Sequence, residues 1–251
     1  MTAGKVKVSP LKLRVYLTCP LRYRYQYLDR LQPRLRPQDT VGTAVHLVLQ
    51  QFFRLPPPER SAGRLLELFD QRWASLSPRY RRMPGVDELR QRARRQLEEF
   101  AAREDLTAQP YLLEPYLEVP LAPDVVLSGR PDRIDQEADG SLHVIDYKTG
   151  EPPQEVDAGQ LRLYAIMVQK GLGRPVSRVS FWFLDGGQVW TEATVPAALA
   201  EAEARAVALA REMQGAASFP GRVGRHCAHC PFLYACQHRE EIAQRRQAEG
   251  W

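Results

Sequence analysis

The chain has 251 residues, of which 44% are hydrophobic, and its 35 Lys+Arg against 30 Asp+Glu give a formal net charge of +5. This length and composition exclude collagen-like, wholly disordered and disulfide-scaffold proteins, and allow one large domain or two small ones. No apolar run approaches the roughly 20 residues that cross a bilayer, and the N-terminus lacks the apolar segment of a secretory signal. We therefore expect a cytoplasmic protein, in which cysteines bind metals more often than they form disulfides.

The charge is unevenly distributed along the chain. Residues 1–38 carry a net charge of +8 and residues 222–251 a net charge of +2, whereas residues 39–221 carry −5. Basic ends around an acidic centre suit a polyanion held over a metal site, but they also suit a solvated arginine-rich surface. Only five of the basic residues are lysines, and Lys148 is one of them. A lysine among so many arginines suggests a need for its compact ammonium group.

The first predicted element spans residues 10–31, where basic and aromatic side chains alternate. Its leucines follow a partial helical pattern that is broken at Pro20. Arginines bind phosphates and tyrosines can stack on bases, so Arg22, Tyr23 and Arg24 are candidate nucleic-acid contacts. The alternative is a core helix whose tyrosines pack inward.

The next elements are helical. Residues 40–53 have valines and a phenylalanine at helical spacing behind a possible cap at Asp39 or Thr40, which predicts a helix. Residues 55–110 then form a polar, arginine-rich region that we interpret as a helical insertion, with a clear amphipathic helix over 89–100.

The remainder of the chain alternates strands and helices. The predicted strands are 112–121, 124–134, 141–148, 179–184 and 189–195, and the predicted helices are 158–170 and 196–213. This order predicts an α/β fold, with a mainly antiparallel or mixed β-sheet flanked by helices, in a single domain over residues 1–251.

The most informative residues are two aspartates and a lysine on adjacent predicted strands. Side chains alternate along a strand, so Asp146 and Lys148 should share one face while Ile145 and Tyr147 face the core. Asp132 precedes them across a turn and could meet Asp146 at one end of the hairpin. Two converging carboxylates suit Mg²⁺ or Mn²⁺, and a lysine beside them can orient the water that attacks a phosphodiester. A surface ion pair is the alternative.

These residues lie in a recognisable order. Gly129-Arg130-Pro131-Asp132-Arg133-Ile134-Asp135, followed by Val144-Ile145-Asp146-Tyr147-Lys148-Thr149-Gly150, resembles the active-site hairpin of the PD-(D/E)XK nuclease superfamily. Within it the chain is similar to the RecB-type exonucleases, which include the AddB nuclease domain and the CRISPR adaptation exonucleases. The resemblance implies a restriction-endonuclease-like mixed sheet. Two further family motifs are matched, Gly-x-x-x-His at 42–46 and Gln-x-x-x-Tyr at 160–164.

The resemblance also implies roles for individual residues. His46 would be a metal ligand together with Asp132, Asp146 and the carbonyl of Tyr147, although a histidine on an apolar helix is more often a core residue. The other implied site residues are Gln160 and Tyr164, which would position DNA or the catalytic lysine, and Arg130, which would contact nucleic acid. Glu114, on the preceding strand, is a candidate further carboxylate.

The four cysteines form a possible ligand set. Cys227, Cys230 and Cys236 follow a C-x₂-C-x₅-C pattern, and Cys19 lies some 200 residues upstream. Thiolates this close favour a soft metal or a cluster, and zinc is the alternative because histidines 226, 229 and 238 lie nearby. The resemblance to iron–sulfur members of the RecB-type family implies a [4Fe–4S] cluster that ties segment 219–239 to Cys19.

Taken together, the resemblance implies a divalent-metal-dependent DNA exonuclease that acts on single strands or DNA ends in repair or recombination. The sequence contains no Gly-x-x-x-x-Gly-Lys-Ser/Thr loop, so unwinding would fall to a helicase or to another repair or CRISPR protein. The alternative is a non-catalytic nucleic-acid-binding or scaffold subunit stabilised by a Cys₄ zinc or iron–sulfur site. Cleavage polarity, exo or endo preference, DNA or RNA specificity and oligomeric state are left open.

Overall fold

The fold is described from a computed structural model that covers residues 5–34 and 36–251. The chain divides into two compact units. The first comprises Met1–Arg36, Pro120–Leu127 and Ala204–Trp251, and the second comprises Pro37–Val119 and Ser128–Glu203. Each unit is described by itself.

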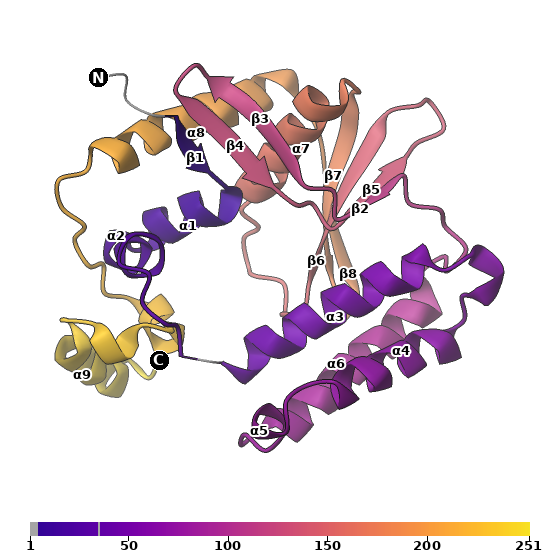
Figure 1. Cartoon of the computed structure of the whole chain (residues 1–251), viewed down its shortest axis with the longest axis horizontal. Coiled ribbons are helices and arrows are strands. Elements are labelled where there is room, and N and C mark those ends of the chain that lie inside the picture. The colour runs from indigo at the N-terminus through magenta and orange to yellow at the C-terminus, as the bar shows by residue number, and fades with distance from the viewer. Residues whose placement is uncertain (1–4, 35) are drawn as a thin grey trace. The chain divides into compact units, whose positions relative to one another are not determined.

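The second unit is built on a five-stranded mixed sheet with the order β2-β5-β6-β7-β8 (Figure 1). Its strands are β2 (Leu112–Leu113), β5 (Arg133–Gln136), β6 (Leu142–Lys148), β7 (Val176–Phe183) and β8 (Gln188–Ala193). Strand β6 runs parallel to β7, and the other neighbours are antiparallel. The structure therefore confirms the predicted α/β fold with a mixed sheet.

The helices of this unit cover the central strand β6. They are α3 (Pro37–Arg54), α4 (Ala62–Ala74), α5 (Pro78–Arg81), α6 (Val86–Arg103) and α7 (Gly159–Leu172), with a 3₁₀ turn η2 at Pro57–Glu59. Residues 55–110 are thus largely helical, as predicted. None of the helices in the described part of the chain combines the length and the apolar character needed to cross a membrane.

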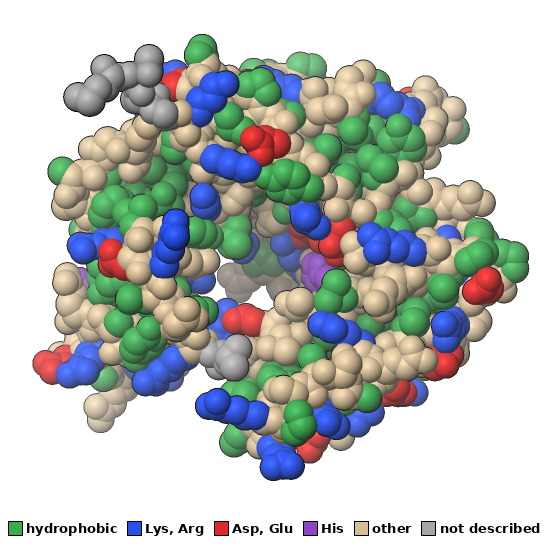
Figure 2. Space-filling model, viewed as in Figure 1, with side chains coloured by type: hydrophobic (Ala, Val, Ile, Leu, Met, Phe, Trp, Pro, Cys, Tyr) green, Lys and Arg blue, Asp and Glu red, His purple; other side chains and the backbone are tan. Residues whose placement is uncertain are grey.

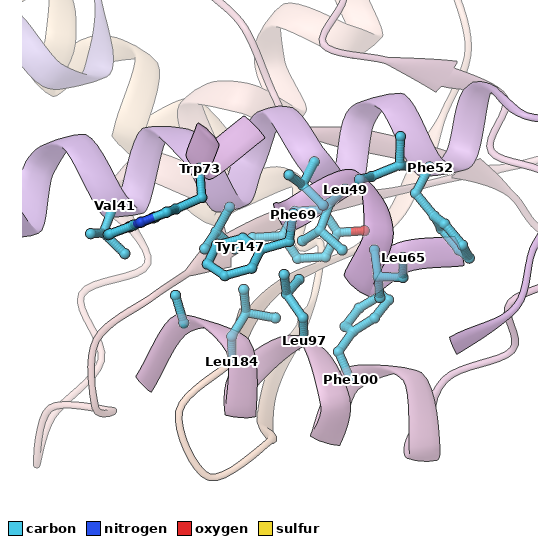
Figure 3. Close-up of a cluster of buried hydrophobic side chains, with 14 of the residues drawn as sticks. Val41, Leu49, Phe52, Leu65, Phe69, Trp73, Leu97, Phe100, Tyr147 and Leu184 are labelled. Carbon is cyan, nitrogen blue, oxygen red and sulfur yellow. The ribbon is translucent and has the colours of Figure 1, made fainter. Parts of the chain in front are cut away.

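The main core lies between helices α3, α4 and α6 and the strand β6. Ile145 and Tyr147 of β6 pack into a cluster with Phe52 of α3, Phe69 of α4 and Leu97 of α6 (Figure 3). Fully burying one such side chain contributes about 1.5–3 kcal/mol to folding. The alternation in β6 is as expected, because Asp146 and Lys148 face α7 instead, where both contact Gln160.

The first unit holds the cysteines and the N-terminal helices. Its elements are β1 (Val6–Val8), α1 (Pro10–Thr18), α2 (Pro20–Tyr23), the π-helical turn η1 (Arg24–Leu28), the 3₁₀ turns η3 (Arg225–His229) and η4 (Leu233–Ala235), and α9 (Arg239–Glu249). Ser9 is the N-cap of helix α1, and its Oγ accepts a hydrogen bond from the amide of Lys12 at 3.2 Å. The predicted break at Pro20 is present. Helix α8 (Pro196–Gly215) begins in the second unit and ends in the first.

A three-stranded sheet with the order β1-β4-β3 replaces parts of the two long strands predicted over 112–134. Strand β3 spans Leu117–Ala122 and β4 spans Val125–Gly129, and β4 pairs in parallel with β1. The first predicted strand is interrupted near Glu114, whose backbone has a left-handed φ of 46°. The second is interrupted at Pro131, which has no amide hydrogen to donate to a sheet. The hairpin formed by β5 and β6 is therefore shorter than predicted.

Candidate active site

The β5–β6 hairpin of the second unit brings Asp132 and Asp146 together. Arg133 is paired with Ile145 across the hairpin, so Asp132, one residue before β5, lies opposite Asp146. The Oδ2 atom of Asp132 accepts a hydrogen bond of 2.7 Å from the backbone amide of Tyr147. The two carboxylates thus meet at the end of the hairpin where the sequence predicted them.

His46 reaches this point from helix α3. Its Nδ1 atom lies 3.2 Å from Oδ1 of Asp132. Burial by itself would lower the pKa of His46, but the hydrogen bond and charge of Asp132, together with the charge of Asp146, raise it overall. Gly42 lies one turn earlier, where an added Cβ would be 3.2 Å from Oγ1 of Thr149. The glycine of the Gly-x-x-x-His motif therefore allows α3 to approach the end of β6 closely.

Lys148, Asp146 and Gln160 form a closed polar triangle. The Nζ atom of Lys148 lies 2.6 Å from Oδ2 of Asp146. Nζ also donates a 3.0 Å hydrogen bond to Oε1 of Gln160. The amide of Gln160 in turn donates to Oδ1 of Asp146 at 3.0 Å. Gln160 stands in the first turn of α7, so this helix fixes the relative positions of the acid and the lysine.

The carboxylate of Asp146 is buried and incompletely hydrogen-bonded. Burial and the charge of Asp132 raise its pKa to about 6, and the charge of Lys148 opposes this rise. Its Oδ2 atom accepts no hydrogen bond of acceptable geometry within the described residues, although the Lys148 ammonium is close enough for an ion pair. A buried acceptor without a donor is costly, and a cation is one partner that can satisfy it.

Tyr164 supports Gln160 from one turn further along α7. Its Oη atom accepts a 3.2 Å hydrogen bond from Nε2 of Gln160. The tyrosine is 8% exposed. An added Cβ on Gly129 would lie 3.1 Å from Cε1 of Tyr164 and 2.8 Å from Cε of Met167. The glycine of the hairpin motif therefore makes room for the helix that carries Gln160 and Tyr164.

Two further residues lie beside these groups: Glu114, already a candidate from the sequence, and Arg133. Glu114 donates its backbone amide to the carbonyl oxygen of Asp132 at 2.9 Å, and burial and the charge of Asp132 raise the pKa of its carboxyl group. Arg133 is buried and binds both carboxylate oxygens of Asp135 at 2.7 Å, with its guanidinium 4.4 Å from the ring centre of Phe53. The role of Arg133 in holding Asp135 was not predicted from the sequence. Its position in the motif, one residue after Asp132 and two before Asp135, was the available signal.

The four cysteines line one pocket in the first unit. Cys19 follows α1, Cys227 lies in η3, and Cys230 and Cys236 each follow a 3₁₀ turn. The pocket also contains apolar side chains, among them Leu21, Phe232 and Ile242. All four cysteines are free thiols. Burial, together with the charges of the other cysteines, raises the pKa of the Cys227 and Cys236 thiols.

Neither site is a ready-formed metal centre. In residues 5–34 and 36–251, no group of three or more His, Cys, Asp or Glu side chains is arranged so that it could hold a metal ion. In the active site, Asp132 is engaged by His46 and Asp146 by Lys148. Each carboxylate therefore has a nitrogen partner within the second unit.

The predicted nucleic-acid contacts differ in their environments. Tyr23 is 9% exposed, and its ring lies 6.0 Å from that of Phe219 and 5.4 Å from that of Tyr16, which favours the core-packing alternative. Arg24 is exposed and pairs with Asp29 at 3.1 Å. The Nε atom of Arg22 is buried and has no hydrogen-bond partner among the described residues. Arg130 is exposed in the second unit.

Comparisons with known proteins address the fold and the family. Among the similar solved structures is a candidate exonuclease from Eubacterium rectale, with a TM-score of 0.56, 10% identity and coverage of 88% of this chain and 86% of that one. Another is SSO0001, with a TM-score of 0.44, 16% identity and coverage of 94% and 88%. No curated protein sequence matches the chain. The family model described as "PD-(D/E)XK nuclease superfamily" matches residues 7–237, so the chain belongs to this superfamily.

Proposed function

We propose that this chain is a divalent-metal-dependent DNA exonuclease that hydrolyses phosphodiester bonds on single strands or at DNA ends, in repair or recombination. Membership of the nuclease superfamily and the similarity in fold to a candidate exonuclease support nuclease activity. The observation that carries the proposal is the convergence of Asp132, Asp146 and Lys148 at one end of the hairpin, where the Lys148 ammonium lies 2.6 Å from the buried carboxylate of Asp146.

The donor types at this point, carboxylate, carbonyl and imidazole, suit a hard divalent cation. Asp132, Asp146 and the carbonyl of Tyr147 would hold Mg²⁺ or Mn²⁺, with His46 as a further ligand. When bound, such an ion polarises a phosphate and lowers the pKa of a coordinated water. His46 lies 3.2 Å from Asp132 and Lys148 lies 2.6 Å from Asp146, so both nitrogen groups stand beside the candidate ligands.

The protein's own groups then position the reacting atoms. The Lys148 ammonium, 2.6 Å from Asp146, would orient the attacking water and offset the negative charge that develops on the phosphate. Gln160 keeps Lys148 within reach, since it binds both Lys148 and Asp146 at 3.0 Å. Tyr164 holds the Gln160 amide in that orientation at 3.2 Å. A compact ammonium suits this position better than a guanidinium.

For the cysteines we propose a [4Fe–4S] cluster held by Cys19, Cys227, Cys230 and Cys236, with zinc as the alternative ligand. Four thiols around one apolar pocket supply the donor set that either would need. The cluster's role would be to join the two ends of the chain. Unwinding of duplex DNA is assigned to a partner such as a helicase or another repair or CRISPR protein.

The test of the catalytic assignment uses end-labelled linear and circular single-stranded DNA with Mg²⁺ or Mn²⁺. We expect the wild type to degrade linear DNA and to leave circular DNA intact. Asp146→Asn and Lys148→Ala should each lower the rate by about 10³-fold, since removing one charge-stabilising group typically costs 10²–10³. Lys170→Ala is the matched control, because Lys170 pairs with Glu203 on the surface.

Two outcomes would contradict the proposal. Cleavage of circular DNA would show an endonuclease. Salt-sensitive DNA binding without cleavage by the wild type, with either metal, would support the non-catalytic binding subunit instead. A matched RNA strand in the same assay decides between the two nucleic acids.

A further inference from the structure

An exposed aromatic ring paired with an arginine stands beside the active site. Tyr116 is 52% exposed, and the guanidinium carbon of Arg130 lies 5.6 Å from the centre of its ring. The Oη atom of Tyr116 donates a 2.9 Å hydrogen bond to Glu118, which helps to fix the outer end of the ring. Both Tyr116 and Arg130 belong to the second unit.

The backbone places this pair close to the catalytic carboxylates. The amide of Glu114 donates to the carbonyl oxygen of Asp132 at 2.9 Å, which joins the segment after β2 to the segment before β5. Tyr116 lies two residues after Glu114, and Arg130 lies two residues before Asp132. The left-handed φ of 46° at Glu114 ends β2 and turns the chain at this point. Such a backbone conformation in a non-glycine residue is found preferentially at functional sites.

Resting on the proposed nuclease function, we propose that Tyr116 and Arg130 form a platform on which an unpaired base of the substrate stacks next to the scissile phosphate. A tyrosine ring binds any base through its π-face, and a guanidinium above it adds attraction for the base and for a neighbouring phosphate. A base within a duplex is already stacked on its neighbours. The platform therefore makes single-stranded nucleic acid the preferred substrate.

A second tyrosine–arginine pair in the same unit provides an internal comparison. Tyr111 is 42% exposed, and Arg174 lies 4.9 Å from its ring centre. Arg174 also donates to the carbonyl of Gly140, in the turn at the opposite end of the β5–β6 hairpin from Asp132. The register places Tyr111 level with Asp135, three residues or about 10 Å from Asp132 in the direction of that turn. Tyr111 therefore offers the same pairing of an exposed ring with an arginine, at a different position in the unit.

The experiment compares cleavage of a single-stranded oligonucleotide with cleavage of a blunt duplex. Tyr116→Ala should raise KM for the single strand about 10-fold, within the range measured for loss of one base–aromatic stack, and leave the duplex unchanged. Tyr116→Phe keeps the ring and should stay within about twofold of the wild type. Tyr111→Ala should match the wild type on both substrates. When an abasic nucleotide is moved along the strand, it should raise the KM of the wild type at one position and leave the KM of Tyr116→Ala unchanged at every position.

An equal loss on single strand and duplex, or a wild type that is indifferent to every abasic position, would overturn the platform. Failure of the proposed function has a different signature, because then the wild type cleaves neither substrate. In that case the same variants are compared by fluorescence anisotropy with the labelled single strand in the Asp146→Asn background. A Kd raised about 10-fold by Tyr116→Ala and unchanged by Tyr111→Ala supports the platform, and equal Kd values reject it.

Discussion

The active site and the cysteine pocket are organised in opposite ways. In the active site, regular elements hold each polar group: β6 carries Asp146 and Lys148, and the first turn of α7 carries Gln160. The Asp132 carboxylate accepts from a backbone amide at 2.7 Å, and Gln160 connects acid and lysine at 3.0 Å. All of these contacts come from β6, α7 and the backbone beside them, so regular elements position the candidate catalytic groups.

The cysteine pocket depends far more on short turns. Between Gly215 and Arg239 the backbone forms the 3₁₀ turns η3 and η4. Two sulfurs make long contacts with one residue: the amide of Arg222 lies 3.5 Å from Sγ of Cys19, and Sγ of Cys227 lies 3.7 Å from the carbonyl of Arg222. Because such contacts are weak, we expect the stability of this unit to depend on a bound group more than the stability of the candidate active site does.

The sharpest test of this contrast is loss of one cysteine. A metal centre that organises a short segment contributes about 10 kcal/mol to its folding, so Cys227→Ser should expose residues 219–239 to protease and lower Tm. Absorption near 400 nm and iron content should fall together. Lys148→Ala should leave all of these unchanged while abolishing cleavage.

His226→Ala is the control for the cysteine variant, because His226 also lines the pocket. If that variant, too, loses the bound group, histidine is a ligand and zinc becomes the better assignment. A colourless wild type with one zinc per chain would lead to the same conclusion. An unchanged Tm and protease pattern in Cys227→Ser would mean that the turns are stable without a ligand.

The sequence was most informative where local pattern decides the structure. The alternation in β6 predicted that Asp146 and Lys148 share a face, and the register at Arg133 confirms that Asp132 lies opposite Asp146. The helix predicted at 158–170 is observed at Gly159–Leu172, which places Gln160 and Tyr164 one turn apart. Helical and strand periodicities carry this information because they depend on neighbouring residues.

The parts that the sequence did not reveal depend on contacts between distant segments. Nothing near Tyr116 in the sequence indicates that Arg130 stacks on it, since this contact arises from the bond between Glu114 and Asp132. The three-residue strand β1 was missed because it is formed by parallel pairing with β4, some 120 residues later. Tyr23 had two open interpretations, and its neighbours from segment 219–239 could not be foreseen.

A smaller effect concerns the pH dependence of stability, which we expect to arise from His143 in the unit of the candidate active site. His143 lies in β6, three residues before Asp146, and its Nε2 atom is 2.7 Å from Oγ of Ser180. Burial lowers the pKa of His143 to about 4, and the charges of Arg178 and Arg133 act in the same direction, against Asp135. The carboxylate of Glu137 also lies 3.7 Å from Nδ1. The folded protein therefore strongly favours the neutral ring.

The sign of the pH effect follows from this shift. In the unfolded chain a histidine has a pKa of about 6.5, so between pH 6.5 and 4 the unfolded state binds a proton that the folded state does not. As the pH falls from 6.5 to 4, the free energy of unfolding should therefore decrease by at most about 3 kcal/mol. Urea denaturation at pH 7 and pH 5 measures the effect. His143→Gln should remove this loss and leave the opposite contributions of His46 and Asp146, whose pKa values are raised, whereas the exposed His229→Gln should behave as the wild type does. Equal pH dependence in all three proteins would refute the assignment.

The smallest effect concerns how tightly α7 approaches the hairpin. In Gly129→Ala the new Cβ would lie 2.8 Å from Met167 and 3.1 Å from the ring of Tyr164, so these side chains must shift. Overpacking of this kind costs about 1–3 kcal/mol, and the shift of Tyr164 should also lower kcat through Gln160. Gly150→Ala is the matched control, since nothing lies within 4 Å of its added Cβ. Thermal melting and steady-state cleavage should both distinguish the two variants. A Gly129→Ala protein that melts lower but keeps its full kcat would show that Gln160 holds its position without Tyr164, because the bonds from Gln160 to Lys148 and Asp146 would then be sufficient.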